Sequence, residues 1–196
     1  YWYKLKKISQ IIHNEKNLNE SLSYIESKFK KYSNPSLKII YDMANIYKRN
    51  KEFEKSIKYY SFLLEKLNAN SEALADVLYK RGSSYERLKD YESSDKDLLK
   101  SLSIRSEDPY VLNYLGYSWL ERGYKIQDAI NMLDKAYNQK KNDPFIIDSV
   151  GWSYYLIGDF VNAEKFLRKA IQLMPNDPIV NDHYGDVLWK LNRKIQ

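Results

Sequence analysis

The residue types that most often bind metals or transfer protons are scarce in this chain. It has 2 histidines and 0 cysteines, and neither His13 nor His183 has a second ligand at the spacing of a metal site. Asp182 and Asp186 lie one helical turn apart around His183 and could hold a cation weakly, but an acidic stripe facing solvent or a partner explains them better. The sequence has no glycine-rich phosphate loop, nucleophile elbow or acid pair. We therefore predict a protein that is not an enzyme and has no catalytic residue, metal or cofactor.

Composition favours a helical protein with a sizeable core. The chain has 196 residues, of which 43% are hydrophobic and 30% charged, with only 6 glycines and 5 prolines. Such a composition suits helices far better than a sandwich or a barrel. No apolar run approaches the length of a membrane span. Because the chain begins at Tyr1 rather than at a methionine, we expect it to be a fragment or a processed form.

Positive charge is concentrated near the N-terminus. Residues 1–50 contain ten Lys/Arg and four Asp/Glu, a difference of +6, which equals the net charge of the whole chain. A basic end could attract nucleic acid, an acidic partner or an anionic membrane surface. A solvated lysine face explains it better, since Lys28, Lys30 and Lys31 end a predicted helix where positive charge suits the helix dipole.

The clearest structural signal is a pair of helices predicted within residues 144–177. Apolar residues recur at helical spacing on both sides of a break at Gly158 and Asp159. Asp143 is a good N-cap, and the proline after it suits the first helical position. Small residues such as Gly151 fall where two antiparallel helices must approach closely.

The same pattern recurs with a period near 34 residues. The glycines at 82, 116, 151 and 185 are 34, 35 and 34 residues apart, and Asp-Pro pairs at 108–109, 143–144 and 177–178 repeat at 35 and 34. Because the glycines and the Asp-Pro pairs recur independently with the same period, the sequence predicts a repeat array. We place one array over residues 1–196, with repeats at 2–36, 37–74, 75–108, 109–143 and 144–177 and a half repeat at 178–196.

This pattern closely resembles the tetratricopeptide repeat (TPR), and the resemblance covers the full chain. Counted from Pro144, the matching residues are Val150, Gly151, Tyr154, Ala163, Leu167, Ala170 and Pro175. The resemblance implies an all-α fold, a right-handed α-solenoid of about 11 helices in antiparallel pairs. The stretch from Leu112 onward looks like the C-terminal part of long proteobacterial TPR proteins. Some of these are envelope lipoproteins that act as adaptors for a protease, so the compartment stays open between bacterial cytoplasm and periplasm or envelope.

The resemblance also implies where a partner would bind. In TPR arrays the first helix of each pair lines a concave groove through positions two, five, nine, twelve and thirteen. In the N-terminal half those positions form a polar and basic wall that includes Asn45, Arg49 and Tyr79. In the C-terminal half they are aromatic and acidic: Tyr110, Asn113, Tyr117, Phe145, Asp148, Trp152, Tyr155, Asp182, Asp186 and Trp189. We predict that this groove binds a partner peptide.

Within the predicted groove, Trp152 and Trp189 are the leading anchors, since they fall one repeat apart at near-equivalent places. Aromatic rings bury side chains, and Asn and Asp fix a backbone or a basic residue. Tyr117 and Tyr155 have an alternative role, which is to pack against the neighbouring repeat. A chaperone-type clamp for a terminal carboxylate is rejected, because Asp42 and Asp76 stand where the anion would dock.

Two functions remain after these exclusions. The first is a non-catalytic adaptor that binds a protein or peptide partner in the groove. The alternative is an assembly scaffold within a longer TPR protein that self-associates through its C-terminal helix. Leu188 and Leu191 lie where a further helix would pack, so we expect the native protein to continue beyond Gln196. Nucleic acid is the weakest partner class, because the groove turns acidic after the second repeat.

Overall fold

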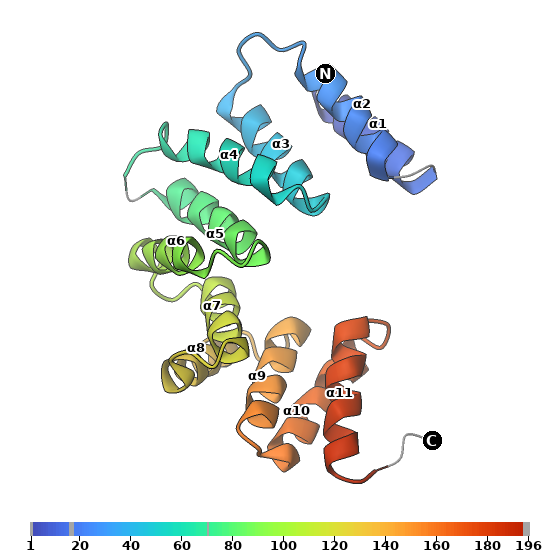
Figure 1. Cartoon of the computed structure of the whole chain (residues 1–196), viewed down its shortest axis with the longest axis vertical. Coiled ribbons are helices and arrows are strands. Elements are labelled where there is room, and N and C mark those ends of the chain that lie inside the picture. The colour runs from blue at the N-terminus through green and yellow to red at the C-terminus, as the bar shows by residue number, and fades with distance from the viewer. Residues whose placement is uncertain (1, 16–17, 70, 194–196) are drawn as a thin grey trace. The chain divides into compact units, whose positions relative to one another are not determined.

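The computed structural model describes residues 2–15, 18–69 and 71–193, and the side chains of residues 12–19, including that of His13, lie outside the description. The described residues form eleven α-helices and no strand, which confirms the all-α fold class (Figure 1). The helices are α1 (Trp2–Glu15), α2 (Leu18–Phe29), α3 (Leu37–Arg49), α4 (Phe53–Leu64), α5 (Glu72–Arg87), α6 (Tyr91–Ile104), α7 (Pro109–Glu121), α8 (Ile126–Gln139), α9 (Pro144–Leu156), α10 (Phe160–Leu173) and α11 (Pro178–Lys190). None of these helices is long and apolar enough to cross a membrane.

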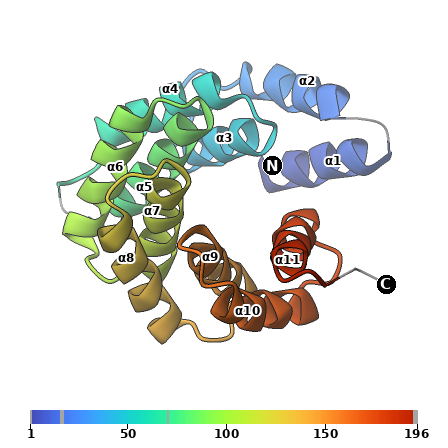
Figure 2. The ribbon, with the colours of Figure 1, turned by 60° about the horizontal axis from the view of Figure 1, so that its bottom comes forward.

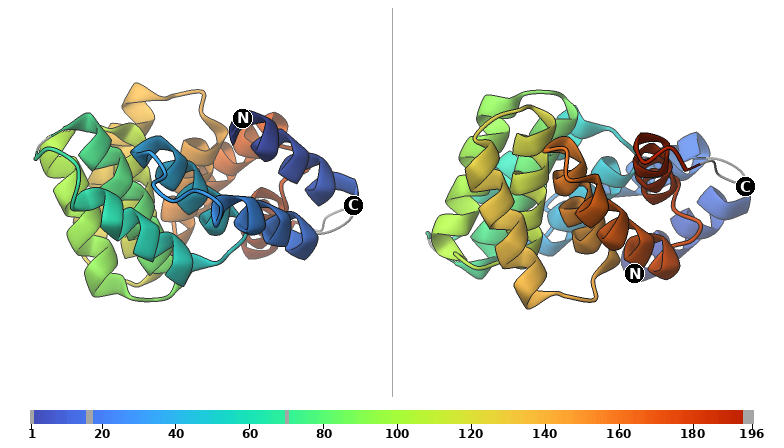
Figure 3. Two further views of the ribbon diagram at one scale, coloured as in Figure 1. Left: turned by 90° about the horizontal axis from the view of Figure 1, so that it is seen from above. Right: turned by 90° about the horizontal axis from the view of Figure 1, so that it is seen from below.

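The chain is divided into two compact units, which we call unit 1 (residues 1–104) and unit 2 (residues 105–196). In unit 1, consecutive helices pack as the pairs α1 with α2, α3 with α4, and α5 with α6. In unit 2, α7 pairs with α8 and α9 with α10, and α11 packs mainly on α10 (Figures 2 and 3). The single array over residues 1–196 and its repeat boundaries stay a prediction.

The first helices of unit 2 begin at the predicted Asp-Pro pairs. The side chains of Asp108, Asp143 and Asp177 each accept hydrogen bonds from two backbone N–H groups of the helix that follows. These bonds satisfy donors that have no partner within the helix, and the proline after each aspartate has no N–H to satisfy. The start of α7, α9 and α11 is therefore fixed by local chemistry.

Glycines allow the paired helices of unit 2 to approach closely. A Cβ atom on Gly151 of α9 would lie 2.6 Å from Leu167 Cγ of α10, and one on Gly116 of α7 would lie 2.9 Å from the Ala129 carbonyl oxygen of α8. Both distances are below van der Waals contact. Leu167 is fully buried, so it has no space into which to move.

The second helix of each pair covers one side of the first helix. In unit 2, Ile147 and Val180 of the first helices α9 and α11 are buried with Ala170 of α10. Val187 of α11 is likewise buried with Leu167. Polar and aromatic residues lie on the sides of α9 and α11 that do not face α10.

We expect the substitution Gly151→Ala to lower the free energy of unfolding by about 1–3 kcal/mol, because the added methyl group overpacks the contact with Leu167. Urea denaturation followed by circular dichroism measures this. Val161→Ala is the matched control, since Val161 is exposed on the same pair of helices and its truncation should change stability by about 0.5 kcal/mol or less. Equal effects of the two substitutions would contradict the close approach.

Candidate functional site

A side-chain hydrogen bond between Asp148 and His183 joins the first helices α9 and α11 of unit 2. His183 Nδ1 lies 3.1 and 3.0 Å from the two carboxylate oxygens of Asp148, and each side chain is only 9% exposed. With a proton on Nδ1, the imidazole donates to the carboxylate and its ring orientation is fixed. The Asp148 carboxylate contacts His183 inside the fold. Asp148 therefore orients His183 and is not an exposed carboxylate of the groove.

Two aromatic rings stack next to this hydrogen bond. The ring of Trp152 lies 4.1 Å from that of His183 at an interplanar angle of 13°, and 4.5 Å from that of Tyr155 at 10°. Trp152 Nε1 also donates a hydrogen bond of 2.5 Å to Glu121 Oε1 at the end of α7. The half-buried Trp152 is therefore held by two stacking partners and one hydrogen bond. We call Trp152, Tyr155 and His183 the ring stack.

Other predicted groove residues of unit 2 are more exposed than the ring stack. Phe145 is 61% exposed and Trp189 81% exposed, and Tyr110 is also exposed. Asp182 and Asp186 are exposed carboxylates on α11. These side chains are accessible, in contrast to Asp148.

The remaining residues predicted for the groove differ in their surroundings. Tyr117 of α7 lies near the stack, with its ring 6.5 Å from that of His183. Asn113 is half-buried, and its Oδ1 accepts no hydrogen bond from a described residue. In unit 1, Asn45 accepts a hydrogen bond of 2.8 Å from the Tyr60 hydroxyl.

The structure therefore brings Asp148, Trp152 and Tyr155 together around His183, and their role in a peptide-binding groove stays a prediction. The structure adds His183 and Glu121, which our sequence reasoning did not assign to the site. One signal could have found His183, because it follows Asp148 by 35 residues, which is one repeat. Residues one repeat apart on consecutive first helices are natural neighbours.

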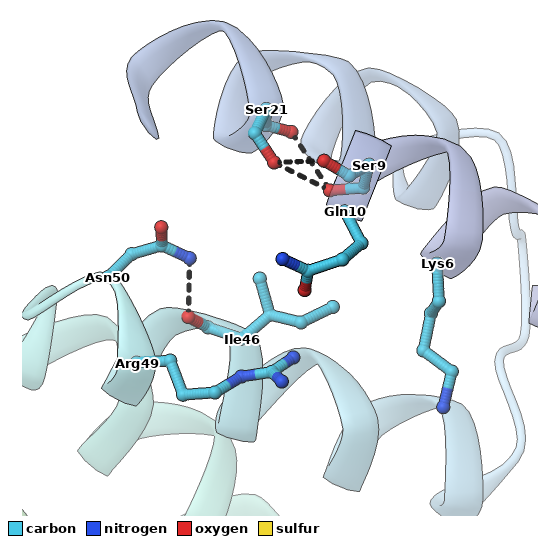
Figure 4. A pocket seen from close by; sticks show the side chains of 7 residues that line it. All are labelled: Lys6, Ser9, Gln10, Ser21, Ile46, Arg49 and Asn50. Carbon is cyan, nitrogen blue, oxygen red and sulfur yellow. Dashed lines mark hydrogen bonds between the residues drawn. The ribbon is translucent and has the colours of Figure 1, made fainter. Parts of the chain in front are cut away.

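Unit 1 has a small polar pocket where α1, α2 and α3 meet (Figure 4). Its volume is about 200 Å³. Gln10 of α1 and Arg49 of α3 project into it from facing helices, and Lys6 lies at its side. Lys6 Nζ also forms an ion pair of 2.8 Å with Asp42.

A second group of cations lies between α3 and α5. Lys48 Nζ donates a hydrogen bond to Ser83 Oγ and lies 5.8 Å from the centre of the Tyr79 ring. Lys80 Nζ lies 6.0 Å from the centre of the Tyr41 ring. Burial, together with repulsion from Lys80 and Arg87, lowers the pKa of Lys48 to about 8.

The arrangement of helix pairs defines a class of protein built from helical repeats, and comparison with known proteins shows which repeats are similar. The family profile described as tetratricopeptide repeat matches residues 37–61 and 75–108. The TPR repeat-containing protein PA4667 of Pseudomonas aeruginosa is 33% identical over 111 residues, which are 57% of this chain and 19% of that protein. Human aspartyl/asparaginyl beta-hydroxylase is 29% identical over 132 residues, 67% of this chain and 15% of that enzyme. The chain thus spans about a fifth or less of the length of these relatives.

Solved structures show the same fold at low sequence identity. A thermophilic TPR protein of Thermus thermophilus is 14% identical, with a TM-score of 0.73 over 96% of this chain and 100% of that chain. YrrB, a TPR protein with an unusual peptide-binding site, is 15% identical, with a TM-score of 0.58 over 91% and 89% of the two chains. Residues 37–61 and 75–108 thus match the tetratricopeptide repeat, and the solved structures share their fold with this chain. Such repeats generally mediate contacts between proteins and are generally not catalytic.

We expect His183→Ala to lower the free energy of unfolding by about 2–4 kcal/mol, because Asp148 would keep a buried carboxylate without its partner. Urea denaturation measures the loss. Asp186→Asn is the control on the same helix, since Asp186 is exposed and its neutralisation should cost about 0.5 kcal/mol or less. A loss at His183 no larger than that of the control would show that the contact between Asp148 and His183 does not stabilise unit 2.

Proposed function

We propose that this chain is a non-catalytic adaptor that binds an extended, basic segment of a partner protein on unit 2, with the ring stack as its centre. The observation that carries the proposal is the arrangement of Trp152, which is half-buried and oriented by His183, Tyr155 and Glu121. Tryptophan and tyrosine supply much of the binding energy in protein interfaces. A ring that is already fixed loses little conformational entropy when a ligand binds, so more of its contact energy becomes affinity.

Charge selects the chemistry of the bound segment. The exposed carboxylates of Asp182 and Asp186 attract lysine and arginine side chains, and a guanidinium group stacks favourably on a tryptophan ring. A basic or arginine-containing segment satisfies both features. We expect a short segment to form an interface of modest size, with dissociation constants on the order of micromolar.

The comparisons support this proposal at the level of the family. TPR proteins bind protein partners, and YrrB has an unusual peptide-binding site. The matched part of aspartyl/asparaginyl beta-hydroxylase is a small fraction of that enzyme. Because the chain itself has no catalytic arrangement in its sequence, we infer binding without catalysis, with a protein in preference to a nucleic acid as partner.

A second function is favoured by one observation on α11. Trp189 is 81% exposed and Ile179 56% exposed, and exposed apolar residues of this size often mark contact surfaces. The alternative is therefore an assembly scaffold in which α11 contacts a second copy of the chain. In that case light scattering would show oligomers that Trp189→Lys converts to monomers, whereas the adaptor proposal predicts monomers for both.

The adaptor proposal predicts that Trp152→Ala weakens binding of a selected peptide by about tenfold or more, since a central ring is lost. Peptides selected from a random library on the wild-type chain should be enriched in Lys and Arg, and fluorescence anisotropy measures their affinity. The control is Phe62→Ala, which removes an exposed ring of unit 1. Unchanged binding to the Trp152→Ala variant would contradict the proposed site.

A charge test separates the acidic residues from the ring stack. Asp182→Asn combined with Asp186→Asn should weaken the same peptides by about tenfold at low salt and reduce the dependence of binding on salt. The two residues are exposed, so the fold should be preserved. If affinity and salt dependence stay unchanged, these carboxylates do not contact the peptide.

A further inference from the structure

The pocket of unit 1 combines features that suit a bound anion. Arg49 and Gln10 project into it from α3 and α1. Among the residues that the structure describes, none forms a hydrogen bond or an ion pair with the Arg49 guanidinium. A guanidinium group presents paired N–H donors whose geometry matches a carboxylate. The Arg49 guanidinium, which lies at the wall of a polar pocket, is therefore available to bind an anion.

The surroundings of the pocket add further positive charge. Lys6 lines the pocket on one side and forms an ion pair with Asp42. On the same helix as Arg49, Lys48 lies between α3 and α5, where Lys80 and Arg87 repel its charge and Asp76 attracts it more weakly. Three cations that repel one another gain stability when an anion binds near them. Unit 1 also holds 20 Lys/Arg against 14 Asp/Glu, which gives it the whole net charge of +6.

We propose that this pocket binds a side-chain carboxylate from an internal acidic segment of a partner protein, with Arg49 as the anchoring residue and Gln10 as a second polar contact. This site is separate from the ring stack of unit 2 and takes a ligand of opposite charge. It does not depend on the function proposed for that stack.

The size and charge of the pocket favour a carboxylate over other anions. A volume of about 200 Å³ is smaller than the roughly 300–1,000 Å³ of a typical cofactor or drug site, so it suits one side chain. Two carboxylates lie nearby, Asp42 on α3 and Asp76 on α5. Asp42 forms an ion pair with Lys6, and Asp76 accepts a hydrogen bond from the Tyr41 hydroxyl. These two carboxylates would repel a phosphate dianion more strongly than a singly charged carboxylate.

The site also differs from a clamp for the C-terminal carboxylate of a peptide. Asp42 and Asp76 occupy the places where such a clamp needs groups that attract an anion. Arg49 lies at the last turn of α3, and residues of α1 and α2 line the other side of the pocket. The proposed ligand is therefore an internal glutamate or aspartate, and a terminal carboxylate is not required.

The test uses the whole chain and a short labelled peptide in which glutamate alternates with alanine, with both termini capped. Fluorescence anisotropy at low salt should show binding, and the same peptide with glutamine in place of glutamate should bind at least about tenfold more weakly. Arg49→Gln should weaken the glutamate peptide by about tenfold, and Arg49→Lys by less, since lysine keeps the charge but not the paired donors. Lys100→Gln is the control, because it removes one exposed positive charge of unit 1 from α6.

Several results would overturn the proposal. They are equal binding of the glutamate and glutamine peptides, equal binding to the wild-type chain and Arg49→Gln, or no binding of the glutamate peptide at low salt. Displacement of the peptide by inorganic phosphate but not by acetate at the same concentration would instead indicate a phosphate site. Trp152→Ala should leave binding of the glutamate peptide unchanged. If that variant weakened it as strongly as Arg49→Gln does, the acidic peptide would bind outside the pocket of unit 1.

Discussion

The close approach of two helices at a residue without a side chain is the constraint on which each pair in unit 2 depends. At Gly151 the backbone of α9 lies so near Leu167 that a single added carbon would be 2.6 Å from its Cγ. This contact fixes the rotation of α9 about its own axis, because only the glycine side of the helix can face α10. Once that side is fixed, every other residue of α9 has a fixed direction, at steps of about 100°.

The fixed rotation decides which residues of neighbouring first helices meet. In unit 2 it places Asp148 against His183, 35 residues further on. In unit 1 the Tyr41 hydroxyl donates to Asp76, also 35 residues further on, at 2.5 Å. One repeat of separation thus brings polar side chains of consecutive first helices into hydrogen-bond distance. These contacts stiffen the face on which we propose that ligands bind, since each one restrains a side chain that solvent would otherwise leave free.

Those parts of the structure that depend on local chemistry could be predicted from the sequence. The Asp-Pro pairs predicted the starts of α7, α9 and α11, because an aspartate cap and a proline at the first position act within a few residues. The period of the glycines predicted helix pairs. The position rule of the repeat family also brought Trp152, Tyr155 and Asp148 to one face. The pairing of particular side chains could not be predicted, because it depends on lateral packing between helices. Our sequence reasoning treated Asp148 as an open acidic position, but its carboxylate is buried against His183.

The two units differ in the chemistry that their first helices leave accessible, and this difference has a functional consequence. Arg49 and Lys48 of unit 1 favour anionic ligands, whereas Asp182 and Asp186 of unit 2 favour cationic ones. A partner segment that suits one face is repelled by the other, so each face rejects the other's ligand through charge. An adaptor with the two sites that we propose would distinguish two partners without a deep pocket, because a charge placed next to another of the same sign lowers the binding energy.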